Sequence, residues 1–298
     1  MKTIISLTKR NIKLFFKDKG MFFTSLITPL ILLVLYATFL SNVYRDSFTS
    51  SIPPQFNVDS KLIDGLVGGQ LISSLLAVSC VTVSFCSNFL MVQDKANGTY
   101  NDLNMSPVKP STLAISYYLA TLISSLMVCY FATALSFVYI ACIGWYMSLA
   151  DVLLFVFDVF IVVLFGTALS SVVNFFLSTQ GQISAVGSIV SSCYGFICGA
   201  YMPISSFGSG LQRIISFLPG TYATSILRNH AMRGALSEME NTIPESVVNE
   251  FKSVLDCNIY FFDKQVTVPA MFAILFGSIA IFMGIYVMLN KLKKPAKS

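Results

Sequence analysis

Few side chains in this sequence could carry chemistry, and they stand apart from one another. The single histidine, His230, lies in a polar stretch, without a serine at the spacing that a hydrolase would need. We therefore expect His230 to be an ordinary surface residue. Asp158 is the one acid inside a long apolar run, where an ionisable group could bind a coupling ion, and Asp151 lies at the edge of that run. The alternative is that Asp158 lies close to the end of the run and is solvated there.

The sequence also lacks the signatures of nucleotide and metal chemistry. It has no phosphate-binding GxxxxGK[ST] loop and no HExxH motif. Its cysteines form no CxxC pair, so we expect them to pack as small apolar residues rather than to bind metal or form disulfides. They are Cys80, Cys86, Cys129, Cys142, Cys193, Cys198 and Cys257. We expect this chain to bind no cofactor or metal and to have no enzymatic activity of its own.

The composition of the chain indicates an integral membrane protein. Hydrophobic residues make up 55% of the 298 residues and charged residues only 11%, and the mean hydropathy is +0.75. A soluble protein carries roughly 25% charged residues, so this chain could not cover itself with water-compatible groups. The net charge of +5 is not gathered into a dense basic stripe, which excludes a nucleic-acid binder, and the apolar content excludes disorder.

Charge-free runs predict an all-α fold with six transmembrane helices. A helix needs about 20 apolar residues to cross a membrane, and the runs place spans at residues 20–44, 65–93, 111–145, 151–177, 183–202 and 266–290. The third run could hold one long helix or two short ones. We favour one helix, because no Gly, Pro, Asn or Asp lies between Ile115 and Ile143. The polar residues from Ser178 to Gln182 predict a turn between the fourth and fifth spans.

The distribution of basic residues predicts the orientation. Lysine and arginine gather in residues 1–19 and in the C-terminal tail, and both of these segments should therefore be cytoplasmic. The basic N-terminus leads into a full-length span and shows no signal-peptide cleavage site. We expect a multi-pass protein of a bacterial plasma membrane, with residues 203–264 on the outer side.

Three segments are neither spans nor simple loops. Apolar residues recur at helical spacing within residues 1–19, which predicts an amphipathic helix in the membrane interface; the alternative is a basic flank that only sets the orientation. The polar loop 94–110 has room for one or two helical turns, which could dock a soluble partner or simply connect two spans. Residues 203–264 begin with short apolar pieces that predict a re-entrant helical pair containing Pro203, Pro219 and Tyr222, followed by a polar extracellular stretch from residue 229.

A stripe of small residues marks the fifth span. Gly187, Ser191, Gly195 and Gly199 recur every four residues, a spacing that lets two membrane helices approach closely. We expect this face to form a helix-packing or dimer interface. The alternative is the ordinary enrichment of glycine and serine in membrane helices.

Two patches carry a resemblance to a known family. The first comprises Gly98 and Thr99, Leu103, and Ser106-Pro107-Val108 in the loop after the second span. The second comprises Met202-Pro203-x-Ser205, Leu211-Gln212, Leu218-Pro219-x-Thr221-Tyr222 and Leu227-Arg228. With the order of the elements, they resemble the membrane permease subunit of type-2 ATP-binding cassette (ABC) exporters, in particular drug and antibiotic exporters. Tyr100-Asn101 stand where that family commonly has Leu-Glu.

The resemblance implies how the chain would work. Gly98, Thr99, Leu103, Ser106 and Pro107 would form a coupling helix that inserts into a soluble P-loop ATPase subunit, two copies of which would bind the ATP and Mg²⁺. The permease would pair with a second permease chain, as a homodimer or heterodimer, around a path formed by spans including two and five. Closure of the ATPase subunits would drive alternating access.

The spans carry Ser, Thr, Cys, Phe and Tyr rather than charge, which suits an amphipathic or hydrophobic cargo such as a drug, a toxin, a lipid-like compound or a peptide. Two other functions stay open. One is an ATPase-independent channel or secondary carrier centred on Asp158, and the other is an immunity or assembly membrane protein that moves no cargo.

Overall fold

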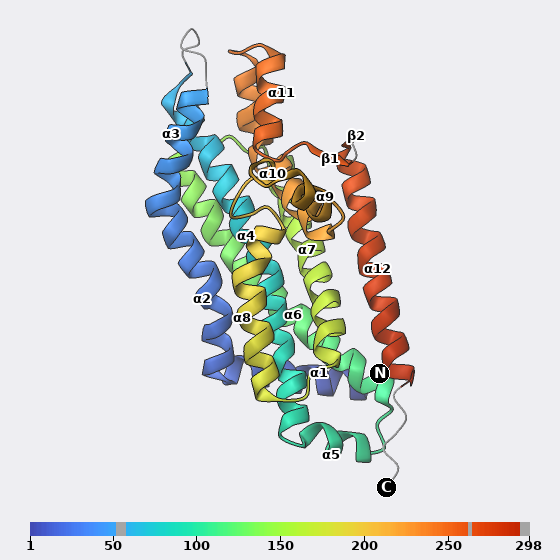
Figure 1. Cartoon of the computed structure of the whole chain (residues 1–298). Helices are drawn as coiled ribbons and strands as arrows, with labels where there is room; N and C mark the ends of the chain where they lie inside the picture. The colour runs from blue at the N-terminus through green and yellow to red at the C-terminus, as the bar shows by residue number, and fades with distance from the viewer. Residues whose placement is uncertain (52–57, 262–263, 293–298) are drawn as a thin grey trace.

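The computed structural model describes residues 1–51, 58–261 and 264–292, and their regular structure is almost entirely helical (Figure 1). The helices are α1 (Lys2–Lys17), α2 (Lys19–Leu35), a π-helical turn (Tyr36–Leu40), α3 (Ser41–Ser51), α4 (Ser60–Ala96), α5 (Thr99–Met105), α6 (Pro110–Ile143), α7 (Leu149–Phe175), α8 (Gln180–Ile197), the 3₁₀ turn η2 (Ile204–Ser206), α9 (Ser209–Ser216), α10 (Pro219–Glu240), α11 (Glu245–Val254) and α12 (Val268–Leu292). Strand β1 (Ile259–Phe261) pairs antiparallel with β2 (Lys264–Val266).

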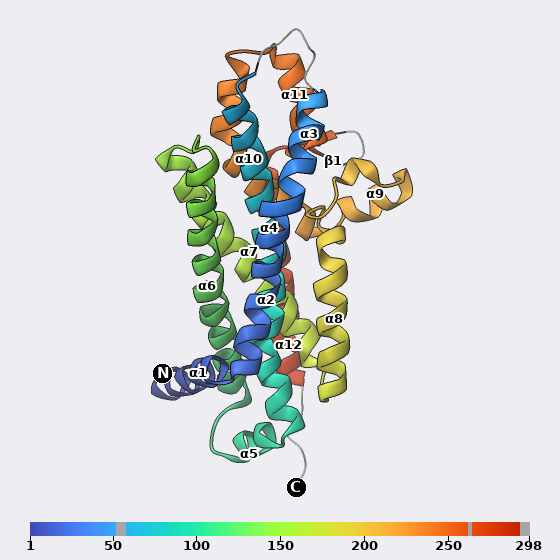
Figure 2. The ribbon, with the colours of Figure 1, turned by 90° about the vertical axis from the view of Figure 1, so that its left-hand side faces the viewer.

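Five helices among the described residues are long and apolar enough to cross a membrane. They are the continuous helix Lys19–Ser50, α4, α6, α7 and α12. The all-α membrane fold is thereby confirmed, and α6 is one unbroken helix, as predicted. Helix α8 covers most of the predicted span 183–202 and lies alongside the bundle, but it is shorter and starts with Gln180-Gly181-Gln182 (Figures 1 and 2). That the fifth predicted span, 183–202, crosses the membrane stays a prediction.

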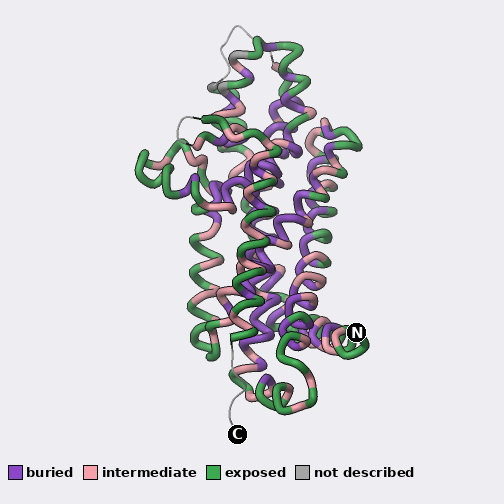
Figure 3. Tube along the Cα trace, turned by 90° about the vertical axis from the view of Figure 1, so that its right-hand side faces the viewer, coloured by how far each residue is buried: buried purple, intermediate pink, exposed green. Residues whose placement is uncertain are grey.

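Helix α4 forms the centre of the bundle. In α4, 94% of the most apolar stretch is buried inside the chain, against 22% for the helix that starts with α2 and 11% for α12 (Figure 3). Helices α2, α6, α7, α8 and α10 pack around it. The expectation that the second span lines a path between two chains is therefore wrong, because α4 is covered by its own chain. The exposed apolar surfaces lie on the outer helices instead.

Close helix contacts depend on glycines, because apolar surface gains little from burial where lipid is the alternative. A Cβ on Gly69 of α4 would lie 2.6 Å from Cγ of Met232 on α10. A Cβ on Gly166 of α7 would lie 3.0 Å from the Cα of Val81 on α4. Helices α7 and α10 thus approach the α4 backbone at positions where a larger residue would not fit.

The two ends of the bundle differ in kind. At one end, α1 lies across the bundle axis and α5 lies below the long helices (Figures 1 and 2). At the other end lie α3, α10, α11 and the β1–β2 hairpin, and α9 projects sideways from the bundle (Figures 1 and 2). Helix α1 packs against α6 and buries Thr8, Asn11 and Phe15, which includes part of the predicted apolar stripe. Ile5, an apolar residue of the same helix, is 55% exposed.

Candidate functional site

Helix α5 is created by a reversal of the chain at the end of α4. Asn97 caps α4, and Gly98 adopts φ 82°, a left-handed conformation that glycine tolerates at little cost. The Gly98 carbonyl then accepts hydrogen bonds from the N–H groups of Asn101 (2.8 Å) and Asp102 (3.2 Å). The Ser106 hydroxyl closes the helix by donating to the Leu103 carbonyl at 2.5 Å.

The structure therefore gathers the residues predicted for coupling into one short element at the α1 end of the bundle. Gly98 precedes α5, Thr99 and Leu103 lie within it, and Ser106 and Pro107 follow it. Asn101, Asp102, Asn104 and Met105 are exposed, and Met105 is 86% exposed. Four of the seven residues of α5 are therefore exposed to solvent.

Tyr100 fixes α5 to the bundle, a role that sequence reasoning missed. Its side chain is buried, and its ring stacks on that of Tyr117 of α6 with centroids 6.3 Å apart and an interplanar angle of 28°. Burial raises the pKa of the Tyr100 hydroxyl, so this group stays neutral. Tyr100 thus provides an aromatic anchor where the family commonly has leucine, and the exposed Asn101 takes the place of the glutamate.

An ion-pair network joins three helices above this anchor. Asp94, near the end of α4, accepts hydrogen bonds from Arg10 Nη1 of α1 at 2.9 Å and from the Tyr117 hydroxyl of α6 at 2.5 Å. Arg10 also donates to Asn11 Oδ1 at 2.8 Å. Because Tyr117 contacts both Asp94 and Tyr100, α1, α4, α5 and α6 meet in a single cluster.

Lys95 extends the cluster to α7. Its ammonium group donates to the carbonyl oxygens of Asn174 (3.1 Å), Phe175 (2.7 Å) and Leu177 (3.0 Å) at the end of that helix. A cation at a helix C-terminus is stabilised by the helix dipole and by otherwise unpaired carbonyls. The base of α4, where α5 begins, is therefore connected to α1, α6 and α7.

Replacing Arg10 by glutamine should loosen α1. The change removes a charge-assisted hydrogen bond worth about 1.5 kcal/mol, so we expect backbone amides in residues 8–17 to exchange hydrogen about tenfold faster. Lys9→Gln, at an exposed position on the same helix, is the matched control and should leave exchange unchanged. Equal protection in the two variants, measured by hydrogen–deuterium exchange mass spectrometry, would show that the ion pair does not hold α1.

A second charged network lies at the opposite end. Arg228 of α10 is 1% exposed; its Nη1 donates to Asp256 Oδ2 at 3.1 Å, and its Nη2 donates to the Gly199 carbonyl at 2.6 Å and to Ser74 Oγ at 3.2 Å. The Ile204 N–H donates to the same Asp256 oxygen at 2.8 Å. Burial raises the pKa of Asp256, and the Arg228 charge opposes that shift only in part. The network ties α4, α8, α10 and the segment after α11 together.

The expectation that His230 is a surface residue is wrong. Helix α10 continues past Arg228 to Glu240 and packs against α4, α7 and α12, so its polar residues up to His230 face neighbours rather than solvent. His230 is 8% exposed, and its Nδ1 lies 2.5 Å from Oδ2 of Asp158, which is 1% exposed. Asp158 is thus buried and not solvated, and Asp151 is paired with Arg233 at 3.4 Å.

The predicted helical pair is present as α9 and α10. Pro203 precedes the η2 turn, and Pro219 is the first residue of α10, where its missing N–H costs nothing. The Tyr222 hydroxyl donates to the Ser216 carbonyl at 2.5 Å, which fixes α10 to the end of α9. The predicted boundary between this pair and a polar outer stretch at residue 229 is wrong, since α10 runs through it.

The stripe of small residues packs within its own chain. A Cβ on Gly187 would lie 3.4 Å from Phe89, and one on Gly195 would lie 2.3 Å from Tyr201. Gly199 is no part of the stripe, because it follows the end of α8 and has φ +70°. Ser191 is exposed. Gly187 and Gly195 therefore pack within this chain, and a dimer interface on the same face stays a prediction.

Cysteine and acidic side chains are dispersed. Within the described residues, no three His, Cys, Asp or Glu side chains gather as a metal site would require. All seven cysteines are free: Cys80, Cys129, Cys198 and Cys257 are buried, Cys86 is partly buried, and Cys142 and Cys193 are exposed. The four buried thiols occupy packing positions, as predicted, and Cys257 does so within a segment that was predicted to be a polar loop.

Apolar helices of membrane length, with a transverse amphipathic helix and a short protruding helix at one end, indicate a multi-pass membrane protein. The family model described as ABC-2 type transporter matches residues 2–231, and the chain belongs to this family. It is a membrane permease component without catalytic activity of its own, and its family associates with ATPase subunits and dimerises. No curated protein matches the chain.

Proposed function

We propose that this chain is the permease subunit of an ATP-driven exporter that moves an amphipathic or hydrophobic compound out of the cell. Two copies of a separate P-loop ATPase subunit would bind ATP and Mg²⁺ and would contact α5 and α1. Both termini would be cytoplasmic, which places α9, α11 and the hairpin on the outer side. The observation that carries the proposal is the cluster that connects α5 to four other helices.

Helix α5 must be held rigidly to the bundle if it is to transmit force. A partner that pushes on α5 does work on the bundle only if α5 cannot yield on its own, because coupling requires a contiguous set of packed groups. Tyr100 fixes α5 to α6, the Asp94 ion pair fixes the base of α4 to α1, and Lys95 fixes it to the end of α7. Displacement of α5 would thus be passed to α4, the central helix.

The proposal includes a second permease chain, whose contact surface would lie on the outer helices. Helix α2 exposes large apolar side chains along much of its length, and α8 does so at fewer positions. They are Phe23, Ile27, Leu30, Ile31, Val34 and Leu35 of α2, and Ile189, Phe196 and Ile197 of α8. A cargo path between two chains would be lined by such surfaces and not by α4.

The test is reconstitution with a candidate ATPase. The purified chain alone in liposomes should hydrolyse no ATP and should move no amphipathic dye against a gradient, whereas the chain co-purified with its ATPase should do both. A Walker-A lysine variant of the ATPase should abolish transport and preserve assembly. Uphill transport by the chain alone would contradict the proposal.

A second function, an ATPase-independent carrier, is favoured by one observation. The His230–Asp158 pair lies within the bundle, and Asp158 Oδ1 has no hydrogen-bond partner among the described residues. Ionisable groups at membrane depth often bind coupling ions. We expect Asp158→Asn to retain at least about half of the ATP-dependent dye flux, because a neutral amide still pairs with His230. If the chain instead transports dye without nucleotide, and Asp158→Asn abolishes that transport, the chain is an ATPase-independent carrier.

A further inference from the structure

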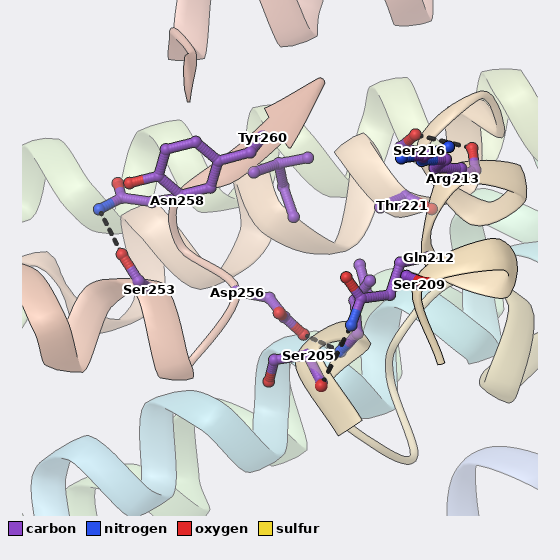
Figure 4. Close-up of a pocket in the computed structure, with 12 residues that line it drawn as sticks. Ser205, Ser209, Gln212, Arg213, Ser216, Thr221, Ser253, Asp256, Asn258 and Tyr260 are labelled. Atoms are coloured by element: carbon purple, nitrogen blue, oxygen red, sulfur yellow. Dashed lines mark hydrogen bonds between the residues drawn. The ribbon is translucent and has the colours of Figure 1, made fainter. Parts of the chain in front are cut away.

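A cavity of about 430 Å³ lies beside α9, at the end of the bundle opposite α5. Its size falls in the range of about 300–1,000 Å³ typical of small-molecule sites. One side is formed by α9 and the start of α10, and the facing side by the segment from α11 to β1 (Figure 4). The cavity lies apart from the α5 cluster and has no role in the coupling argued above.

Hydrogen-bonding groups line this cavity. Ser205 and Ser209 contribute hydroxyl groups that have no side-chain hydrogen bond among the described residues, and Asn258 contributes an amide. Asp256 is the acid among the lining residues, and Arg228 and the Ile204 N–H already engage its Oδ2. The negative charge at the cavity floor is therefore balanced inside the protein.

Arg213 supplies the unbalanced charge. It lies on α9, lines the cavity, is exposed, and forms no salt bridge within the described part of the chain. A guanidinium group presents several donors in a plane and suits the oxygens of a phosphate group. With the hydroxyls beside it, the site is suited to a phosphate group that carries one or two negative charges.

The other face of α9 indicates where such a phosphate comes from. Ser209, Arg213 and Ser216 share the cavity face of this helix, since they are spaced by three or four residues. Leu211 and Ile214 lie on the opposite face and are 46% and 62% exposed, and Phe217, which follows the helix, is 60% exposed. In Figure 2, α9 projects from the bundle on the side of α8. A short helix with this division is suited to the membrane interface, with its apolar face toward the acyl chains.

We propose that α9 holds the anionic phosphate headgroup of a phospholipid in this cavity, with Arg213 and the neighbouring hydroxyls as its ligands. The lipid belongs to the leaflet at the α9 end, which is the outer leaflet in the orientation proposed above. Leu211 and Ile214 lie beside the acyl chains, and the phosphate reaches the polar face of the same helix. Binding depends on the headgroup charge and does not require the ATPase.

Lipid retention by the intact chain tests this site. The chain is purified in mild detergent with phosphatidylglycerol or phosphatidylcholine, and bound lipid is counted by native mass spectrometry. We expect retention of phosphatidylglycerol over phosphatidylcholine and an about tenfold weaker retention of phosphatidylglycerol in Arg213→Gln, because a charge-assisted hydrogen bond is lost. Arg213→Lys should keep most of the binding. Lys264→Gln, at an exposed position on β2 outside the cavity lining, should keep all of it.

Two results would overturn the proposal. One is the same phosphatidylglycerol retention in Arg213→Gln as in the unchanged chain. The other is equal retention of the two lipids together with displacement of phosphatidylglycerol by millimolar glycerol 3-phosphate, which would assign the cavity to a soluble phosphate.

Discussion

Replacement of Arg228 by methionine is expected to destabilise the folded chain by about 3–5 kcal/mol, since it leaves the buried Asp256 carboxylate without its cation. The same change removes the donors to the Gly199 carbonyl and to Ser74. Three segments far apart in sequence would lose their common partner. The free energy of unfolding, measured by denaturant titration in detergent micelles, should fall by more than it does for any single substitution of an exposed residue.

The matched control is Arg233→Met on the same helix. Arg233 also pairs with an acid, Asp151, but its side chain is 61% exposed and the two atoms are 3.4 Å apart. Asp151 is buried, but it keeps the hydrogen bonds that the Ser148 N–H and hydroxyl donate to its Oδ2, so loss of the solvated Arg233 guanidinium should cost about 0–1 kcal/mol. The double change Arg228→Met with Asp256→Asn should recover part of the lost stability, because no buried charge remains, and asparagine tolerates the φ of 52° at position 256. Equal losses in Arg228→Met and Arg233→Met would refute the buried-pair argument.

The main helices could be predicted because length and charge alone determine them. A run without charge or breaker residues must form a helix in lipid, where unpaired backbone groups are costly. That reasoning located α4 and α7, and it identified α6 as a single helix. The turn before α8 could also be predicted from the sequence. Thr179 caps that helix, and Gln182 donates its backbone N–H to the Thr179 hydroxyl.

The buried charges could not be predicted, because their partners are set by tertiary contacts. Helix α10 carries Arg228 and His230 and has the composition of a surface segment, yet it is enclosed by α4, α7 and α12. The acids that compensate these two residues, Asp256 and Asp158, lie on other elements, 28 and 72 residues away. No periodicity within one segment indicates such pairs.

The candidate coupling site was located from sequence, but its anchor was not. Gly98 and Pro107 mark the ends of the loop as breakers, so a short helix between them was readable. Tyr100 departs from the pattern of the family, and only its contact with Tyr117 of α6 shows what it does. Its apolar ring at the start of a polar loop was the one signal that could have indicated burial.

Replacing Gly98 by proline should abolish association with the ATPase while leaving the chain in the membrane. Proline fixes φ near −65°, whereas this position has φ 82°, and it removes the N–H that donates to the Lys95 carbonyl at 3.3 Å. The reversal after α4 would then take another direction, and α5 would leave its place beside Tyr117. An ATPase subunit that binds α5 as a rigid element should lose at least about 100-fold in affinity, which corresponds to about 2.7 kcal/mol.

Gly98→Asn is the control for this change. A Cβ at position 98 would meet no atom within 4 Å, and asparagine adopts the left-handed conformation more readily than other side chains. The variant should therefore keep α5 in place, and it should co-purify with the ATPase nearly as well as the unchanged chain. Deletion of residues 97–103 should behave like Gly98→Pro. Undiminished co-purification of both disruptive variants, with membrane insertion verified by protease protection, would mean that the ATPase contacts the chain elsewhere, with α1 as the next candidate because Arg10 joins it to the same cluster.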